Sequence, residues 1–153
     1  MKIISENRKA EFDYEILDRF EAGLVLNGQE VKSIKTNGAS LNGTYVMLRQ
    51  EKRARRPELF WLGANVPPYQ PGNIMSNYDT QRARKLLLNR KEINYLIGKT
   101  KVKGLTLVAL RLYDNNAKLK LEFGIGRGRK KFNKKELIKT RDAEREIRRA
   151  LAR

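Results

Sequence analysis

Residues 117–125 read AKLKLEFGI, the most regular alternation of apolar and polar side chains in the sequence. The apolar side chains occupy every second position, at Leu119, Leu121, Phe123 and Ile125. A period of two residues is typical of a β-strand that buries one face and exposes the other. The stretch therefore predicts a strand packed against a core.

Further strands are predicted on the N-terminal side of this stretch. The segment 106–113 is rich in β-branched and apolar residues, and Asp114-Asn115-Asn116 has the composition of a turn. Three other runs have strand character: residues 12–26, with a bend near residues 21–23; residues 44–49; and residues 59–66. A polar loop over residues 50–57 joins the second of these runs to the third. Five or six antiparallel strands in a chain of this size predict a mainly β fold, an OB-like barrel with peripheral helices.

Three helices are predicted from capping patterns. Asn27 precedes Glu30 by three residues, which is a capping box, and Gly38 can end that helix. Asn89 and Glu92 repeat the pattern for a helix that ends at Gly98. A third helix is predicted to start at Asp79 and to carry Ala83, Leu86 and Leu87.

Positive charge divides the chain into two regions. The 153 residues include 34 Lys and Arg but 17 Asp and Glu, a net charge of +17. Residues 126–153 hold +8 of this charge and residues 1–125 hold +9, which predicts a barrel over 1–125 and a basic tail over 126–153. The tail has little apolar content, so we expect its helix to form on a target.

So much positive charge points to a polyanionic partner. Nucleic acid is the first candidate and an anionic membrane surface the second, but no stretch approaches 18 consecutive apolar residues. The N-terminus lacks the pattern of a signal peptide, which predicts a cytoplasmic protein.

Several kinds of chemistry have no support in the composition. Cysteine and histidine are absent, which excludes disulfides, His-based acid–base catalysis and Cys or His metal ligands. Asp13 and Glu15 share one strand face, but a solvated face is the simpler interpretation. We expect no metal, no cofactor and no enzymatic activity.

Four basic motifs are candidates for RNA contact, and each has a simpler explanation. The run Asn7-Arg8-Lys9-Ala10 is an RNA-contacting arm or a frayed terminus. The run 28–33 is a binding helix or a capped structural one, with Glu30 in the cap. The run 82–88 adds phosphate-binding cations or is a core helix with a solvated face.

The fourth motif, Gly126-Arg127-Gly128-Arg129-Lys130-Lys131, predicts a flexible phosphate clamp. A solubilising tail or a nuclear-localisation-like run would have the same composition. Phe132 follows directly, and an aromatic ring beside cations favours stacking on an unpaired base. The alternative is that Phe132 packs back onto the barrel.

Taken in order, these runs resemble the tmRNA-binding protein family of bacterial trans-translation, small protein B. The resemblance begins near residue 5 and reaches the end of the chain. Its most specific part is the spacing of three runs, EAG at 21–23, EVKS at 30–33 and RKLLL at 84–88. Asp13-Tyr14, residues 104–108 and residues 128–131 continue it.

The resemblance implies both a fold and a function. It implies an OB-like barrel that binds the tRNA-like domain of tmRNA, and a tail that is disordered when free. On a stalled ribosome the tail would reach the decoding centre and the empty mRNA channel and become helical. It also implies a monomer, one copy per tmRNA.

The implied contacts fall into two groups. Those to tmRNA are Asn7, Arg8, Lys9, Glu30, Lys32, Ser33, Arg84, Lys85, Lys130 and Lys131. Those to the small-subunit rRNA of the ribosome are Phe132, Asn133, Lys134, Lys135, Lys139, Arg141, Arg145, Arg148 and Arg149.

The chain departs from the family pattern at four places. Phe12 replaces a common His, Thr80 follows Asp79 in place of Pro, and the loop 50–57 is longer than usual. Asn133-Lys134-Lys135 replaces the usual Asp-Lys-Arg, which bears on how the tail engages the decoding centre. A ribosomal protein or assembly factor that binds rRNA is the alternative function, and an RNA-processing enzyme is the third.

Overall fold

The alternating stretch lies within β7 (Lys118–Gly128) in the computed structural model of the chain, which describes residues 1–69, 78–129 and 131–151. All four of its predicted inward side chains are buried. β7 forms a hairpin with β6 (Leu105–Asn115). The turn residues Asn116 and Ala117 have φ values of 52° and 66°, the left-handed backbone that two-residue hairpin loops require. The turn therefore lies further along the chain than predicted, and Asp114 and Asn115 belong to β6.

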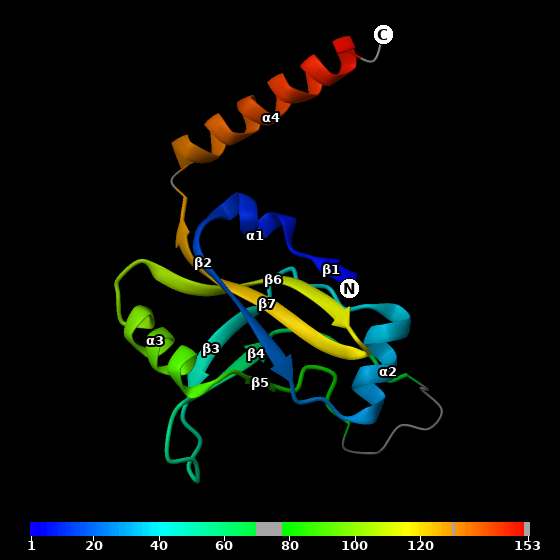
Figure 1. Cartoon of the computed structure of the whole chain (residues 1–153), viewed down its shortest axis with the longest axis vertical. Helices are drawn as coiled ribbons and strands as arrows, with labels where there is room; N and C mark the ends of the chain where they lie inside the picture. Colours follow the sequence, from blue (N-terminus) through cyan, green and yellow to red (C-terminus); the bar gives the residue numbers. More distant parts are fainter. Residues whose placement is uncertain (70–77, 130, 152–153) are drawn as a thin grey trace.

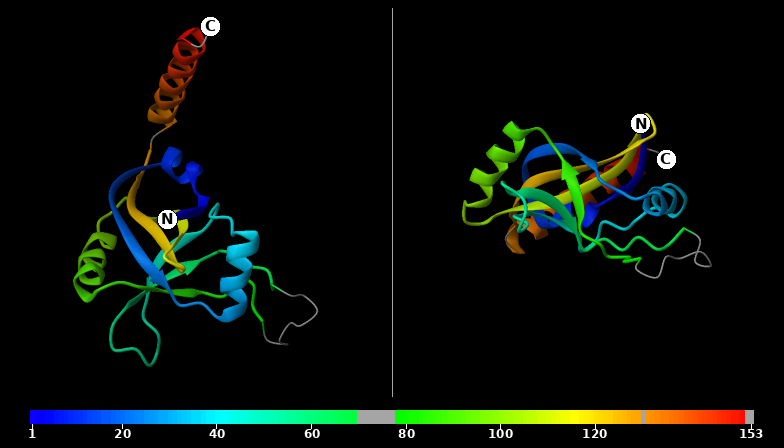
Figure 2. Two further views of the ribbon diagram at one scale, coloured as in Figure 1. Left: turned by 45° about the vertical axis from the view of Figure 1, so that its right-hand side comes forward. Right: turned by 90° about the horizontal axis from the view of Figure 1, so that it is seen from below.

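β7 also pairs along its other edge, with β2 (Tyr14–Leu24), and this closes a barrel. The remaining strands are β1 (Lys2–Glu6), β3 (Tyr45–Arg49), β4 (Glu58–Leu62) and β5 (Arg84–Leu87). The strand order is β1-β6-β3-β4-β5-β2-β7, and β6 pairs with β7 as well. Six strands thus form an antiparallel ring, with β1 added outside on β6 (Figures 1 and 2). The predicted OB-like, mainly β fold is confirmed.

Side chains from every strand of the ring fill the barrel, among them Trp61, Leu86 and Phe123. Gly124 has a specific role where β7 crosses β2. A Cβ atom at this position would lie 2.7 Å from the carbonyl oxygen of Asp18, at the register shift between Ile16 and Asp18. Any larger residue would push the two strands apart, so the closure of the barrel depends on this glycine.

Two predicted helices are confirmed. In α2 (Gly28–Asn37) the side chain of Asn27 accepts from the Glu30 N–H, Glu30 accepts from the Asn27 N–H, and Gly38 is the C-cap with φ 71°. In α3 (Arg90–Thr100) the side chain of Asn89 caps the first turn, but the helix continues past Gly98. α2 and α3 lie on the outside of the barrel (Figure 1).

Two strand predictions were too long. The predicted strand 12–26 begins only at Tyr14, because Asn7 caps a short helix, α1 (Arg8–Asp13), that the sequence did not reveal. The predicted strand 59–66 ends at Leu62, because Gly63 adopts φ 83° and turns the chain.

The helix predicted from Asp79 was wrong, because Arg84–Leu87 is strand β5. Leu86 is fully buried in the barrel while Leu87 is half exposed, which is the alternation of a strand. A run of three leucines fits a helix and a strand equally well when only one turn of sequence is available. Pairing with β4 and β2 decides the outcome.

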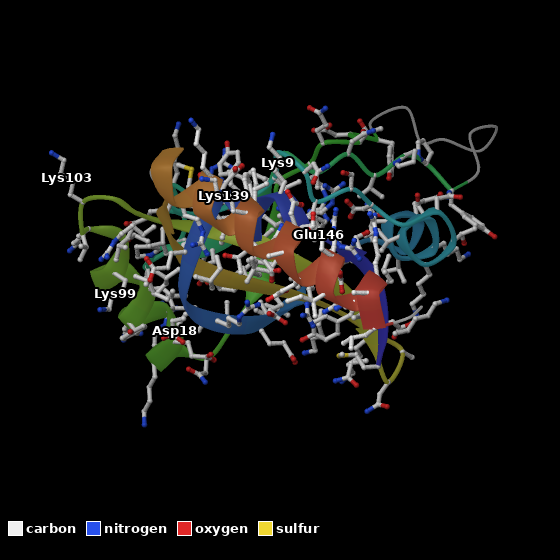
Figure 3. All side chains as sticks on the ribbon, turned by 90° about the horizontal axis from the view of Figure 1, so that it is seen from above. Lys9, Asp18, Lys99, Lys103, Lys139 and Glu146 are labelled. Carbon is white, nitrogen blue, oxygen red and sulfur yellow. The ribbon has the colours of Figure 1, made fainter. Side chains whose placement is uncertain are left out.

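The C-terminal segment leaves the barrel at one end. β7 continues through Gly128, so the barrel extends beyond the predicted boundary at residue 125, and residues 126–128 form strand in place of a flexible clamp. α4 (Lys131–Leu151) follows and projects from the barrel (Figures 1 and 2). Figure 3 looks down on this helix, which carries Lys139 and Glu146. Within the described residues, no helix is apolar and long enough to span a membrane.

Candidate RNA interface

The first predicted motif forms a rigid corner that carries exposed cations. Asn7 is buried, and its side chain accepts from the Ala10 N–H at 3.1 Å and donates to the Ala109 carbonyl at 2.9 Å. Because both ends of its amide are used within the protein, Asn7 holds α1 against β6. Arg8 and Lys9 are exposed beside it.

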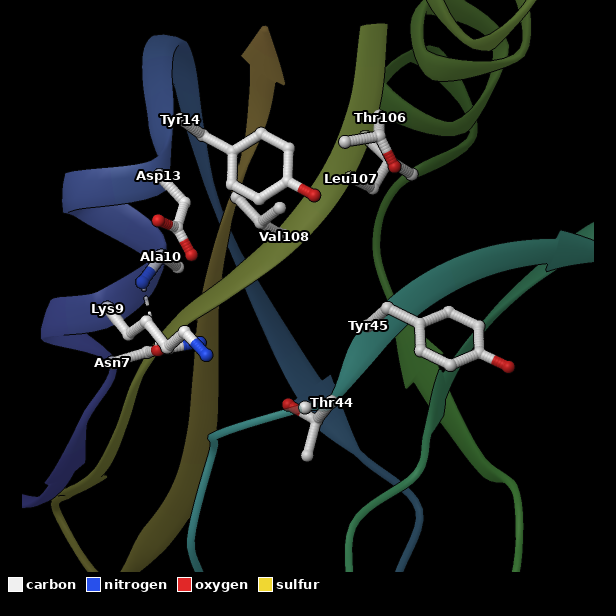
Figure 4. A pocket seen from close by; sticks show the side chains of 11 residues that line it. Asn7, Lys9, Ala10, Asp13, Tyr14, Thr44, Tyr45, Thr106, Leu107 and Val108 are labelled. Carbon is white, nitrogen blue, oxygen red and sulfur yellow. Dashed lines mark hydrogen bonds between the residues drawn. The ribbon is translucent and has the colours of Figure 1, made fainter. Parts of the chain in front are cut away.

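A pocket of about 520 Å³ opens between α1, β3 and β6 (Figure 4). Lys9 and Asp13 line it from α1, Tyr14 lies at the start of β2, and Tyr45 lies across the pocket on β3. The Tyr45 side chain is 47% exposed although tyrosine is largely apolar. A cation with two accessible aromatic rings is the combination that binds phosphates and stacks unpaired bases.

The second and third motifs meet inside the protein. Glu30 and Arg84 are both completely buried, and Arg84 Nε donates to Glu30 Oε2 at 2.5 Å. The other oxygen, Oε1, accepts from Arg82 Nη2 at 2.5 Å and from the Asn27 N–H at 3.0 Å. Ser33, one turn further along α2, is also fully buried. Glu30 and Arg84 therefore join α2 to β5 from the inside of the protein.

Electrostatics keep this buried carboxylate ionised. Burial raises the pKa of Glu30, but hydrogen bonds from Arg82 and Asn27 and the charge of Arg84 together bring that pKa below its ordinary value. Arg84 is satisfied in turn, because it also donates to the carbonyls of Ala64 and Thr80, both at 3.0 Å. Every charge at this junction has a partner, as burial requires.

Exposed cations surround this junction. Lys32 lies on the outer side of α2, with its Nζ 5.9 Å from the centre of the Tyr69 ring. Lys85 is half-buried and points outward from β5, since its neighbours Arg84 and Leu86 point inward. Arg82 keeps 38% of its side chain exposed while it binds Glu30.

The predicted tail contacts lie on α4. Lys135, Lys139, Arg141, Arg145, Arg148 and Arg149 are all exposed. Arg141 also lies over the ring of Phe12, 5.8 Å from its centre, and so connects α4 to α1. Lys130 lies outside the described residues, as do the side chains of Lys131, Phe132, Asn133 and Lys134.

Comparison with known proteins agrees with this arrangement. A sequence model of the family described as SmpB protein matches residues 4–153. The chain belongs to the SmpB family. SsrA-binding protein from Magnetococcus marinus is 45% identical over 150 residues, which cover 98% of this chain and 95% of that protein. SsrA-binding protein from Acetivibrio thermocellus is 47% identical, with 98% and 93% covered.

A solved structure extends the similarity to three dimensions. It is described as "tmRNA-SmpB: a journey to the center of the bacterial ribosome", and its matching chain is 40% identical, with a TM-score of 0.63. The alignment covers 82% of this chain and 84% of that chain. The resemblance seen in the sequence motifs is thereby confirmed, and SmpB is a family of RNA-binding proteins.

Two features of this SmpB-family chain were not visible in its sequence. Tyr113 donates a short hydrogen bond from its hydroxyl to Glu21 on the outside of the barrel, and burial together with that bond raises the pKa of Tyr113. Tyr45 lines the pocket on the side opposite Tyr14. Outward positions of strands β2, β3 and β6 supply these side chains, and only the closed barrel brings them together.

The described part of the chain contains no group of three acidic side chains placed to hold a metal ion. Its acidic residues serve other purposes. Glu122 and Glu11 both bind Arg19, at 2.8 and 3.3 Å, and Glu58 binds Arg90 at 3.4 Å. The cations that remain without such partners therefore dominate the outer surface.

Proposed function

We propose that this protein binds the tRNA-like domain of tmRNA and delivers it to stalled ribosomes for trans-translation. The observation that carries the proposal is the similarity to SsrA-binding proteins, which covers the barrel and the tail together at about 45% identity. A protein that shared only an RNA-binding barrel would not match over residues 4–153.

The barrel supplies the tmRNA contacts in this proposal. Its cationic contacts are Arg8, Lys9, Lys32 and Lys85, and Tyr14 and Tyr45 offer rings for stacking. Lys130 and Lys131, which follow the barrel in the sequence, add two further cations. Asn7, Glu30, Ser33 and Arg84 contribute indirectly, because they fix α1, α2 and β5 beneath those contacts. Phosphate contacts position the RNA, and the pocket residues meet its bases.

The tail supplies the ribosome contacts. Its cations would enter the mRNA channel and decoding centre, with Lys135, Lys139 and Arg145 along the way and Phe132 near the start. The helix exposes Ile138, Ile147 and Leu151 and carries many like charges, so it gains little stability by itself. We therefore propose that it is disordered in the free protein and becomes helical when RNA neutralises it.

The protein acts here as an RNA adaptor and not as an enzyme. One monomer accompanies one tmRNA, and a ribosomal partner would place it in the cytoplasm. No cofactor is needed, because recognition depends on charge and stacking alone.

Copurification followed by RNA sequencing tests the proposal. The tagged full-length protein should enrich tmRNA far above its share of total RNA. Uniform recovery of rRNA with a single ribosomal subunit would favour a ribosomal protein or assembly factor instead. Cleavage of the bound RNA by the purified protein in Mg²⁺ would contradict the non-enzymatic part.

A further inference from the structure

The loop between β3 and β4 is the most basic connection in the barrel. Residues 49–57 read RQEKRARRP and hold five cations against one acid, Glu51. Lys52, Arg53, Arg55 and Arg56 are all exposed. Within the described residues none of these four makes an ion pair, so their charges are available to a partner.

The base of this loop is held in place by two contacts. The guanidinium of Arg49 lies over the ring of Phe60, 5.8 Å from its centre. Glu58 accepts a hydrogen bond from Arg90 Nη2 at 3.4 Å, which joins the hairpin to the start of α3. Lys91 is exposed next to that contact and adds a further cation. The loop therefore forms a basic edge with a fixed base.

The composition of the loop indicates what kind of partner it binds. Its only apolar residues are Ala54 and Pro57, and both are partly buried. Protein interfaces rely on buried aromatic or aliphatic anchors, and this loop offers none. A phosphate backbone requires only cations spaced along a path.

The position of the loop indicates which RNA it meets. The β3–β4 loop projects from the end of the barrel opposite α4 (Figures 1 and 2). Under the proposed function α4 enters the mRNA channel, so the loop lies outside that channel, and tmRNA is the RNA that the barrel itself binds.

We propose that the basic edge formed by Arg49, Lys52, Arg53, Arg55 and Arg56 makes a second contact with the sugar–phosphate backbone of tmRNA, independent of base sequence. This inference rests on the proposed function, because it takes its RNA from there. It assigns to the loop a role in holding tmRNA that the pocket and α1 do not cover.

The test compares two variants of the full-length protein that lose the same charge. One carries Lys52→Gln, Arg53→Gln, Arg55→Gln and Arg56→Gln. The control carries Lys2→Gln, Lys101→Gln, Lys103→Gln and Lys118→Gln, which are exposed and lie outside the loop. Binding to tmRNA is measured across a series of salt concentrations, and melting temperatures verify that both variants are folded.

The loop variant should bind tmRNA about tenfold more weakly near physiological salt, with a salt slope smaller by roughly two to three. The control should change that slope by less than about one. Equal losses in both variants would mean that only overall charge matters, and would overturn the inference. A loop variant that binds tmRNA as the unmodified protein does would also overturn it.

Two further outcomes separate this inference from the proposed function. If the unmodified protein does not prefer tmRNA over other RNA, the proposed function itself fails. If the loop variant keeps tmRNA binding but loses binding to ribosomes without tmRNA, the partner is rRNA and the inference is wrong. Hydroxyl-radical footprinting adds an independent readout, since the loop variant should lose protection at one backbone segment while protection by the pocket remains.

Discussion

Arg84 donates to Glu30 across 2.5 Å in the interior of the protein, and neither side chain is exposed. The two residues are 54 positions apart in the sequence. Their ion pair joins α2 to β5 and places Lys32 and Lys85 on the surface around the junction. Two charged motifs that a reader of the sequence would assign to RNA contact therefore act first as structure.

Arg84→Ala should destabilise the protein by about 3–5 kcal/mol, because it removes the fully buried cation that pairs with the buried carboxylate of Glu30. Urea unfolding measures the loss. Arg90→Ala is the matched control, since its pair with Glu58 is longer and partly exposed and should contribute less than about 1 kcal/mol. Similar losses of unfolding free energy in the two variants would show that burial does not determine how much an ion pair contributes to stability.

Stability should fall when the protein is acidified through the titration of Glu30. The pKa of Glu30 is lower in the folded state than its ordinary value of 4.5, so the carboxylate stabilises the fold above about pH 4.5. This contribution disappears as the pH falls through the folded pKa. Urea midpoints between pH 7 and pH 3 should decline less steeply for Glu30→Gln than for the unmodified protein, and parallel declines would contradict the assignment.

Neighbouring residues of the first motif should separate stability from RNA binding. Lys9→Ala should weaken tmRNA binding severalfold and leave the melting temperature unchanged, since the side chain is exposed at the pocket rim. Asn7→Ala should lower stability by about 1–3 kcal/mol, because it removes a helix cap and leaves buried groups unpaired. Thermal melts and binding titrations on both variants test this. An Asn7→Ala protein as stable as the unmodified protein would contradict the role of Asn7 in holding α1 against β6.

Local patterns predicted the parts of this fold that depend on neighbours in sequence. Asn27, Glu30 and Gly38 define α2 within a dozen residues, and the alternation ending at Ile125 defines β7. By contrast, β5 was mistaken for a helix because its strand character comes from pairing with β4 and β2.

The candidate site was predictable only in part for the same reason. Composition and motifs located the cations, yet they gave no indication of which charged residues point inward. The pocket draws on α1, β3 and β6, so Tyr45 could be assigned to it only after the barrel was known.

A fragment of residues 1–129 should bind the tRNA-like domain within about tenfold of the full-length protein, a loss below about 1.4 kcal/mol. The reason is that every paired strand residue and the pocket lie within it. A fragment of residues 1–125 is the informative control. It loses the pairs that Gly126, Arg127 and Gly128 make with β2 and should melt at a lower temperature. Complete loss of binding by the 1–129 fragment would contradict the assignment of tmRNA binding to the barrel.

Phe132→Ala should leave tmRNA affinity and melting temperature unchanged while peptide tagging on stalled ribosomes falls. A single ring stacked on an exposed rRNA base contributes roughly 1–3 kcal/mol, enough to impair engagement. Phe12→Ala makes a useful comparison, because that ring contacts Arg141 from the barrel side. A drop of several degrees in the melting temperature of Phe132→Ala would assign the ring to the core and refute the stacking role.

β7 is the strand that closes the barrel, and it leads directly to the tail. It has nine partner pairs with β2 and ten with β6. Tension applied to the tail along β7 would therefore shear the hydrogen bonds to β2 and to β6 at the same time. It could not detach β7 by breaking the hydrogen bonds to one neighbouring strand alone. If a ribosome grips α4 and moves it, the force reaches the barrel as a displacement of the whole body. The tail is thus mechanically coupled to the central strand of the barrel, and RNA bound to the barrel would move together with the tail.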